Sequence, residues 1–412
     1  TQLAVGVSKP YTYILGGEKG KNGEMTTFQS LATAIAAQVG TGNLAGAATA
    51  LIGGGPGAIF WMWVSAFFGM STIYAEATLA QQYKVKKDGE VTGGPVYYIR
   101  AAFKGTFGKA LAAIFAILIV LALGFTGNMV QSNSIGAAFS EVFSARNIEI
   151  PSIVFGLILA AVIGFIFLGG VNRLASVVEK IVPIMAGIYI VGSLVLILMN
   201  ITALPGAIKM IFVGAFNPEA VVGAGAGIAV REAIRFGVAR GLFSNEAGMG
   251  STPHAHARAK VENPHKQGLA AMISVFIDTF IILNLTVFSI LTTGVLDSGK
   301  EGTALTQAAF TKGFGNFGDI FVAVCLLFFA FSTILGWHFF GEVNVKYLFG
   351  EKAAKFYSIL VIGFVIVGST LKVQLVWSLS DFFNGLMVIP NAIALWALSG
   401  VVVKICKQYG KK

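Results

Sequence analysis

The chain has 412 residues, of which 56% are hydrophobic and only 12% are charged, and its formal net charge is +10. Soluble domains contain about 25% charged residues, so this composition excludes an ordinary soluble globular protein. The two cysteines, Cys325 and Cys406, exclude a disulfide framework, and in so apolar a chain the basic excess indicates membrane topology rather than nucleic-acid binding.

Apolar segments of nearly 20 residues recur along the chain and match the roughly 30 Å hydrocarbon core of a bilayer. The 51 glycines are typical of helices that pack closely in lipid. We therefore predict an all-α polytopic membrane protein with a single domain over residues 1–412. The predicted spans are 27–52, 57–82, 108–139, 151–170, 175–200, 219–250, 268–294, 317–345, 354–371 and 374–403.

Loop charges test the number and direction of these spans. With the segment before residue 27 in the cytoplasm, the opposite side receives only five of the 29 Lys and Arg residues. These five are Arg146, Lys209, Lys300, Lys312 and Lys372. This count assigns the arginines of the sixth span to the cytoplasmic side, but it does not determine their depth in the membrane. The positive-inside rule predicts a multi-pass protein of the cell (plasma or inner) membrane with both core termini cytoplasmic.

Ten spans divide into two halves of five, about 27–200 and 219–403. An odd number of spans in each half forces opposite orientations, which is the geometry of inverted repeats with a site at the midplane between discontinuous helices. We predict a ten-helix 5+5 inverted repeat with discontinuous helices 1 and 6, although no sequence identity between the halves is evident.

The first span contains a break signal, "AAQVGTGNLAG", at residues 36–46. Gly40 and Gly42 each cost about 1 kcal/mol relative to Ala in a helix, and backbone groups freed in lipid must find partners. If the segment unwinds, the amides that follow and the positive end of the next half-helix suit a carboxylate. The carbonyls of Ala36 and Val39 suit a small hard cation. Alternatively, the glycines serve only to pack against a neighbouring helix.

Two long motifs make the chain similar to a known family. The stretches "VGTGNLAGAATALIGGGPGAIFWMWVSAFFGM" (39–70) and "RFGVARGLFSNEAGMGSTP" (235–253) resemble the signatures of the alanine or glycine:cation symporter family. This family belongs to the amino acid–polyamine–organocation superfamily. The "GTGN" context also resembles the first helix of sodium-coupled transporters with the leucine-transporter-like fold.

The resemblance runs the length of the chain and implies a sodium-coupled symporter, not an enzyme. Its substrate is expected to be a small zwitterionic amino acid, alanine or glycine, carried by alternating access around a midplane site. The family has an extra helix before the ten-helix core. Residues 1–15 look like the end of that helix, so we expect it to be missing or truncated here. No obligate protein partner is evident beside the lipid bilayer.

The resemblance also places the substrate on particular residues. It puts the substrate carboxylate on the amides of Thr41 and Gly42, with Asn43 bracing the break. The third span contributes "GFTGNMVQSNSIG", in which Asn128 and Gln131 are three residues apart and share a face. Either amide could contact the substrate, or both could serve as hydrogen-bonding glue between helices.

The coupling ion, Na⁺, is expected between the carbonyls of Ala36 and Val39 and hydroxyls of the eighth span. That span reads "LFFAFSTILGWHFFGE", in which Ser332 and Thr333 are adjacent hydroxyls. Their alternative role is a hydrogen bond to the carbonyl four residues earlier in the same helix.

The sixth span should hold a second break, and it offers two candidates. One is "GAGAG" (223–227) and the other is "RFGVARG" (235–241). The second would bury three charged side chains at the midplane, at about 3 kcal/mol or more each. We therefore place the break at Gly225 and Gly227, whose freed carbonyls would meet the substrate ammonium. Phe236 and Trp337 are candidate pocket walls, which would leave room only for a small side chain.

Two alternatives stay open. A proton-coupled transporter of the same fold could use Glu76 or Asp278, which otherwise serve as structural partners inside their spans. A membrane-embedded enzyme is less favoured, because the chain contains no G-x-S-x-G, H-E-x-x-H or phosphate-binding loop. His254 and His256 form an H-x-H pair that we expect in a solvated loop, since two ligands make a poor metal site.

Overall fold

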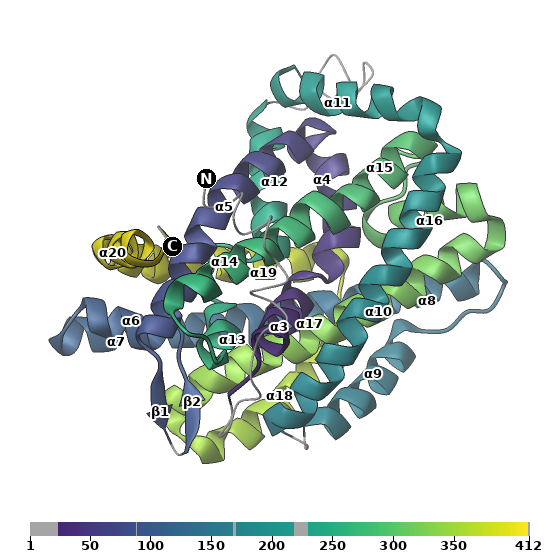
Figure 1. Cartoon of the computed structure of the whole chain (residues 1–412). Coiled ribbons are helices and arrows are strands. Elements are labelled where there is room, and N and C mark those ends of the chain that lie inside the picture. Colours follow the sequence, from purple (N-terminus) through teal and green to yellow (C-terminus); the bar gives the residue numbers. More distant parts are fainter. Residues whose placement is uncertain (1–23, 88, 168–169, 218–229, 411–412) are drawn as a thin grey trace.

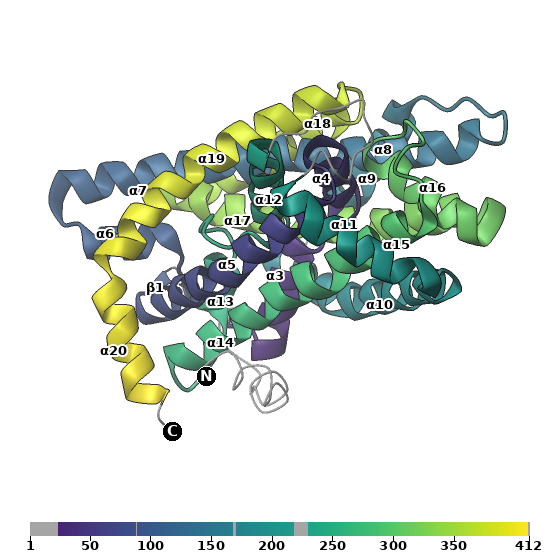
Figure 2. The same cartoon turned by 90° about the horizontal axis from the view of Figure 1, so that it is seen from above.

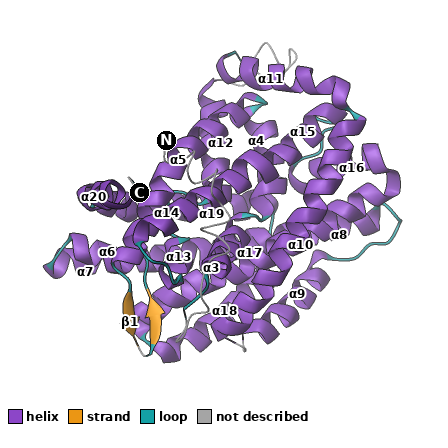
Figure 3. Ribbon diagram, viewed as in Figure 1, coloured by secondary structure: helices purple, strands orange, loops and turns teal. Residues whose placement is uncertain are grey.

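The computed structural model describes residues 24–87, 89–167, 170–217 and 230–410, and helices dominate this part of the chain (Figures 1 and 3). Strands β1 (Val85–Lys87) and β2 (Glu90–Thr92) form an antiparallel hairpin. The first half contains α3 (Thr27–Gln38), η1 (Gly42–Gly46), α4 (Ala47–Gly54), α5 (Gly57–Gln82), α6 (Pro95–Ala102), α7 (Gly105–Ile119), η2 (Val120–Gly127), α8 (Asn128–Ser144), α9 (Ser152–Phe167) and α10 (Gly170–Met199). The second half contains η3 (Ile201–Ala203), α11 (Leu204–Phe216), α12 (Val230–Asn245), α13 (Pro253–Arg258), α14 (Pro264–Val275), η5 (Phe276–Leu283), α15 (Asn284–Thr293), α16 (Gly302–Phe314), η6 (Gly315–Phe317), α17 (Gly318–Phe349), α18 (Glu351–Gly368), α19 (Val373–Ala397) and α20 (Ser399–Tyr409).

The helices fit a polytopic membrane protein, as predicted. Six described helices, some continuing through a π or 3₁₀ segment, are long and apolar enough to cross a bilayer. The bent pair of α3 with η1 and α4 would make a seventh span. The predicted span 57–82 coincides with α5, and most other predicted spans lie on described helices within a few residues.

Several elements were not predicted. Helix α11 lies across one end of the molecule, where it contacts α5, α12 and α15 (Figure 1). Helix α16 precedes α17, and the two pack against each other. The last predicted span is two helices rather than one, because the chain bends at Leu398 and α20 turns away from α19 (Figure 2).

Helix α17 is the centre of the bundle. It packs against α3, α8, α10, α16 and α18, and it carries several of the largest fully buried side chains, among them Trp337, Phe329 and Phe339. Burying such rings is the main source of tight packing energy in a membrane interior, where close contact replaces the hydrophobic effect. Ser332 and Thr333, the two hydroxyls predicted to bind the ion, therefore lie on a helix whose residues are mostly buried.

The charged start of α12 lies at the end of the molecule opposite the β1–β2 hairpin. Arg231 and Arg235 pair with Glu232 at 3.1 and 2.8 Å, and both arginine side chains are largely exposed. Arg235 also lines a cavity together with Glu141 and Glu301. The loop-charge count placed these arginines with the hairpin side, and that assignment was wrong. Their position at a helix end explains how the span tolerates them.

Helix α12 approaches α5 so closely that a side chain would not fit at one point. A Cβ atom on Gly237 would lie 2.4 Å from the carbonyl oxygen of Ala58. The backbones of the two helices therefore touch directly, which small residues permit in membrane bundles.

Gly237→Ala is expected to lower the thermal unfolding temperature of the purified protein. Helix propensity alone would favour Ala by about 1 kcal/mol, but overpacking against α5 costs roughly 1–3 kcal/mol. The matched control is Gly363→Ala in α18, where a Cβ would have nothing within 4 Å. If Gly237→Ala were as stable as Gly363→Ala, the close approach would not exist.

Candidate functional site

The first span is interrupted where the sequence predicted it. Helix α3 ends at Gln38, Val39 is extended, and π-helical turns begin at Gly42. The two halves of the span are bent by 47° relative to each other. A Cβ on Gly40 would lie 2.3 Å from Oγ1 of Thr333, so the glycine also permits a close helix contact. The break and the packing role therefore coexist.

Side chains form hydrogen bonds with backbone groups of this first break and with one another. The amide of Gly40 donates to Oδ1 of Asn43 at 2.9 Å. Nδ2 of Asn43 in turn donates to Oδ1 of Asp278 at 2.7 Å. Ser244 of α12 donates to the same carboxyl group at 3.0 Å. Asp278 thus connects η5, the first break and the end of α12, which is a structural role that its isolated position in the sequence did not reveal.

The third span meets the first break through Gln131 of α8. Oε1 of Gln131 accepts from the amide of Thr41 at 3.1 Å and from its hydroxyl at 2.7 Å. Nε2 of Gln131 is buried and has no partner among the described residues. Nδ2 of Asn128 donates to the carbonyl of Gly124 in its own helical segment, while its Oδ1 is buried and unpartnered. Nε2 of Gln131 and Oδ1 of Asn128 are therefore available to bind a ligand.

The predicted ion ligands converge on the other side of the break. Oγ1 of Thr333 lies 2.9 Å from the carbonyl oxygen of Ala36 and 3.4 Å from that of Val39. Oγ of Ser332 lies 3.5 Å from the Ala36 oxygen. Both hydroxyls also donate to the carbonyl of Phe329 in their own helix, so the alternative role is present as well. An all-oxygen set of this kind suits a hard cation.

The sixth span breaks at residues 246–252, between α12 and α13. Neither sequence candidate coincides with this position. Residues 235–241 are helical, and Gly225 and Gly227 lie outside the described residues. The observed break contains Gly248 and Gly250, both with positive φ, so its "GMG" matches the "GTG" of the first break. That repeated Gly-x-Gly was the signal in the sequence that could have identified it.

A carboxylate also braces this second break. Glu76 of α5 accepts from the amide of Gly248 at 3.2 Å and from that of Gly250 at 2.9 Å. Nδ2 of Asn391 in α19 donates to the same carboxyl group at 2.5 Å and to the carbonyl of Gly248 at 2.9 Å. Backbone groups freed by unwinding are therefore satisfied by α5 and α19.

Trp337 lies beside the second break. Its Nε1 donates to Oε1 of Glu246 at 2.7 Å, and Ser251 donates to the other carboxyl oxygen. Glu246 has φ of 57°, which is uncommon for a residue other than glycine and typical of strained functional positions. Phe243 of α12 meets the Trp337 ring edge-on at 5.5 Å. Sequence reasoning missed Glu246, which lies inside the second family motif.

The second predicted wall, Phe236, lies elsewhere. It lines a cavity of about 800 Å³ among α4, α8, α12, α16 and α19, which we call the vestibule. A Cβ on Gly53 would lie 2.4 Å from the Phe236 ring, so Phe236 packs on α4. Arg240 and Asp381 form a two-pronged ion pair at 2.9 and 2.5 Å in the vestibule lining, and the guanidinium lies over Trp377.

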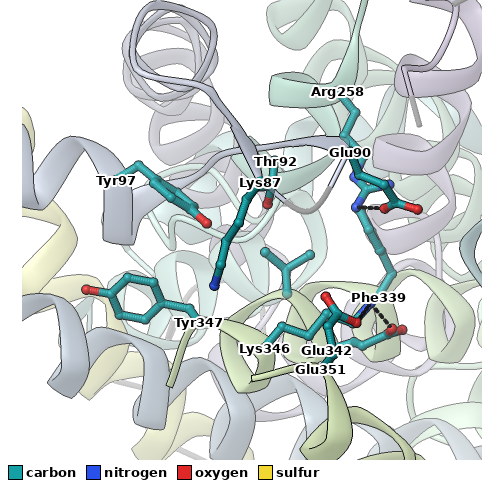
Figure 4. A pocket seen from close by; sticks show the side chains of 11 residues that line it. Lys87, Glu90, Thr92, Tyr97, Arg258, Phe339, Glu342, Lys346, Tyr347 and Glu351 are labelled. Carbon is teal, nitrogen blue, oxygen red and sulfur yellow. Dashed lines mark hydrogen bonds and ion pairs between the residues drawn. The ribbon is translucent and has the colours of Figure 1, made fainter. Parts of the chain in front are cut away.

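At the opposite end of the molecule, hydrogen bonds and an ion pair connect the start of α3, the end of α13 and the hairpin. The amide of Met25, just before α3, donates to the carbonyl of Arg258, and Lys260 donates back to Met25. The Arg258 side chain pairs with Glu90 of the hairpin at 3.1 Å and lies over Phe339. Arg258, Glu90 and Phe339 line a small pocket of mixed charge between the hairpin and α17 (Figure 4).

The two histidines of α13 belong to this end of the molecule and are buried, so the expectation of a solvated loop was wrong. His254 contacts the carbonyl of Ser251 at 2.7 Å and the side chain of Asn344 at 2.8 Å. His256 contacts Gln267 at 2.7 Å. The described residues contain no group of His, Cys, Asp or Glu that could hold a metal ion.

Comparison with known proteins gives a consistent result. Residues 6–412 match the sequence profile of the Sodium:alanine symporter family. The chain is 42% identical to the sodium/alanine symporter AgcS of Methanococcus maripaludis over 94% of this chain and 85% of that protein. It is 40% identical to the putative sodium/proton-dependent alanine carrier protein YrbD of Bacillus subtilis, over 96% and 83%.

Among solved structures, MhsT in complex with L-phenylalanine is similar, with a TM-score of 0.65 and 14% sequence identity over 91% of this chain and 90% of that one. This similarity shows a shared fold, the leucine-transporter-like fold, and confirms the predicted fold class.

Glu76→Ala is expected to destabilise the protein. The substitution leaves the buried amide of Gly250 and the half-buried amide of Gly248 without an acceptor, at roughly 1–3 kcal/mol for a buried group, so thermal unfolding should occur several degrees lower. Glu76→Gln should fall between Ala and wild type, because its amide oxygen still accepts one bond. The control is Glu149→Ala at an exposed position. Equal unfolding temperatures for Glu76→Ala and Glu149→Ala would show that Glu76 does not brace the break.

Proposed function

The chain belongs to the sodium:alanine symporter family, and on this premise we propose that it carries alanine or glycine across the membrane together with Na⁺. Family membership and the apolar helices identify it as a cation-coupled amino acid symporter, which is a multi-pass membrane protein and not an enzyme. The observation that most strongly supports alanine or glycine transport with Na⁺ is the first break. There the side chains of Asn43, Gln131 and Thr333 form hydrogen bonds with backbone groups.

We assign the substrate carboxylate to the amides of Thr41 and Gly42. Both precede a restarted helix, whose amino end favours a negative group. Gln131 contacts Thr41 from the third span, and Gln131 and Asn128 each have one polar atom without a partner among the described residues. Asn43 holds the break open by occupying the Gly40 amide.

The Na⁺ ion is assigned to the carbonyls of Ala36 and Val39 and the hydroxyls of Ser332 and Thr333. Substrate and ion would then be held by the same interrupted segment, which is only a few residues long. Each would stabilise the conformation that the other needs, and this gives a positive coupling of their affinities.

The ammonium end of the substrate is assigned to the second break at residues 246–252. That segment brings the carboxyl group of Glu246 close to Trp337. The Trp337 and Phe243 rings limit the space between the two breaks, which favours the side chains of alanine and glycine. Phe236 is assigned to the entry path, since it lines the vestibule.

We infer alternating access because the two ends of the molecule differ. One end has the vestibule, and the other is held together by the Met25–Arg258 contacts. We place the vestibule outside the cell and the hairpin end in the cytoplasm, in agreement with the loop-charge bias and cytoplasmic core termini. In this arrangement the Met25–Arg258 contacts close the inner side. The ten-helix 5+5 organisation, with repeats at about 27–200 and 219–403, remains our prediction for the single domain.

A proton-coupled transporter of the same fold is the second candidate. Glu76 and Asp278 are buried, and neither forms an ion pair with the described residues. Such carboxyl groups inside a membrane are typical of proton relays. YrbD, which is described as a putative sodium/proton-dependent carrier, supports this alternative.

Uptake of labelled alanine into proteoliposomes tests the proposal. We expect an inward sodium gradient to drive accumulation and a proton gradient alone to drive little. Glycine should compete with alanine, and leucine should compete poorly, because the Phe243 and Trp337 rings pack against each other beside the assigned site. Accumulation driven by protons without sodium would favour the second candidate.

Replacing Ser332 and Thr333 by Ala together is expected to raise the sodium concentration for half-maximal alanine uptake by roughly tenfold or more, since two ion ligands are lost. The matched control is Thr292→Ala with Thr293→Ala, an adjacent buried pair that bonds to its own helix. Unchanged sodium dependence in the Ser332 and Thr333 variant would show that the ion binds elsewhere.

A further inference from the structure

Gln131 already makes the contacts that the proposed substrate needs. Its side-chain oxygen accepts from both the amide and the hydroxyl of Thr41, and the side chain is fully buried. A Cβ on Gly40 would come within 3.2 Å of this same oxygen. The oxygen therefore lies directly against the backbone of the first break.

An amide oxygen and a carboxylate oxygen accept hydrogen bonds in the same way, but the carboxylate is the stronger acceptor because it is charged. The Thr41 amide has a single proton to donate. A substrate carboxylate bound there must therefore displace Oε1 of Gln131. The contact seen in the structure and the proposed substrate contact exclude each other.

The other end of the Gln131 amide is incompletely bonded. Nε2 is buried and has no partner among the described residues, although buried amide donors are nearly always hydrogen-bonded. If the carboxylate replaces Oε1, rotation of the amide about its last bond can turn Nε2 toward the carboxylate. The unpartnered donor would then gain a charged acceptor.

We propose that Gln131 is an exchangeable cap of the first break. Its oxygen satisfies Thr41 when no carboxylate is bound, and its nitrogen donates to the carboxylate once the substrate has displaced that oxygen. This inference rests on the proposed function, and it explains how the freed backbone avoids being unpaired in either condition. It makes Gln131 both a cap of the unwound backbone and a ligand of the substrate carboxylate.

Binding of alanine to the purified full chain at saturating sodium tests the exchange. Gln131→Glu keeps the acceptor for Thr41, removes the donor and adds a negative charge. It should weaken alanine binding by about 100-fold or more. Gln131→Leu removes both the oxygen that competes with the carboxylate for Thr41 and the nitrogen that would donate to the carboxylate. Its alanine affinity should stay within roughly threefold of wild type, while the ligand-free protein unfolds at lower temperature.

The two effects on Gln131→Leu distinguish the exchange from simpler roles. A pure ligand donor would lose alanine affinity by more than about tenfold with no loss of ligand-free stability, and that result would overturn the proposal. Unchanged affinity and unchanged stability would show simple packing and would also overturn it. Ser132→Ala is the matched control, because its hydroxyl donates to the carbonyl of Met129 within α8. If Gln131→Leu fails to fold, Gln131→Met provides the same comparison.

Failure of this inference can be told from failure of the proposed function. Wild-type protein that binds neither alanine nor glycine would refute the function, and the exchange with it. Wild-type protein that binds alanine in a sodium-dependent way, together with either contrary result for Gln131→Leu, would refute the exchange alone.

Discussion

The structure depends on one constraint: a helix that unwinds inside a bilayer must find partners for the backbone groups that it frees. Here side chains of other helices provide these partners. Asp278, in the second span of the second half, holds the first break through Asn43. Glu76, in the second span of the first half, holds the second break through the amides of Gly248 and Gly250. Each half of the chain thus supports the break of the other half.

This crossed support explains why both breaks lie at one site. The first break, the end of α12 and η5 meet at Asp278, and α5, α19 and residues 246–252 meet at Glu76. Three π-helical segments, η1, η2 and η5, occur in the spans around these points. Such segments shift the helical register and are frequent at functional sites. The irregular backbone is therefore concentrated where substrate and ion are assigned.

The sequence was sufficient for local features and insufficient for contacts between distant residues. Gly40 and Gly42 revealed the first break because glycine destabilises a helix interior. Two glycines so close together therefore indicate an interruption. The second break was missed because the arginines of α12 were assigned to the cytoplasmic side, beyond a break at Gly225 and Gly227, whereas Arg235 and Arg240 line the vestibule. Glu76 and Asp278 were visible as buried carboxyl groups, but their partners are far along the chain. Sequence periodicity carries no information about such pairs.

A structure of the protein determined with alanine and Na⁺ tests the central claim most directly. The account predicts that the alanine carboxylate lies within hydrogen-bonding distance of the Thr41 and Gly42 amides. The ion should lie among the oxygens of Ala36, Val39 and Thr333. An alanine molecule bound away from the first break, or a continuous helix through residues 36–47, would contradict it.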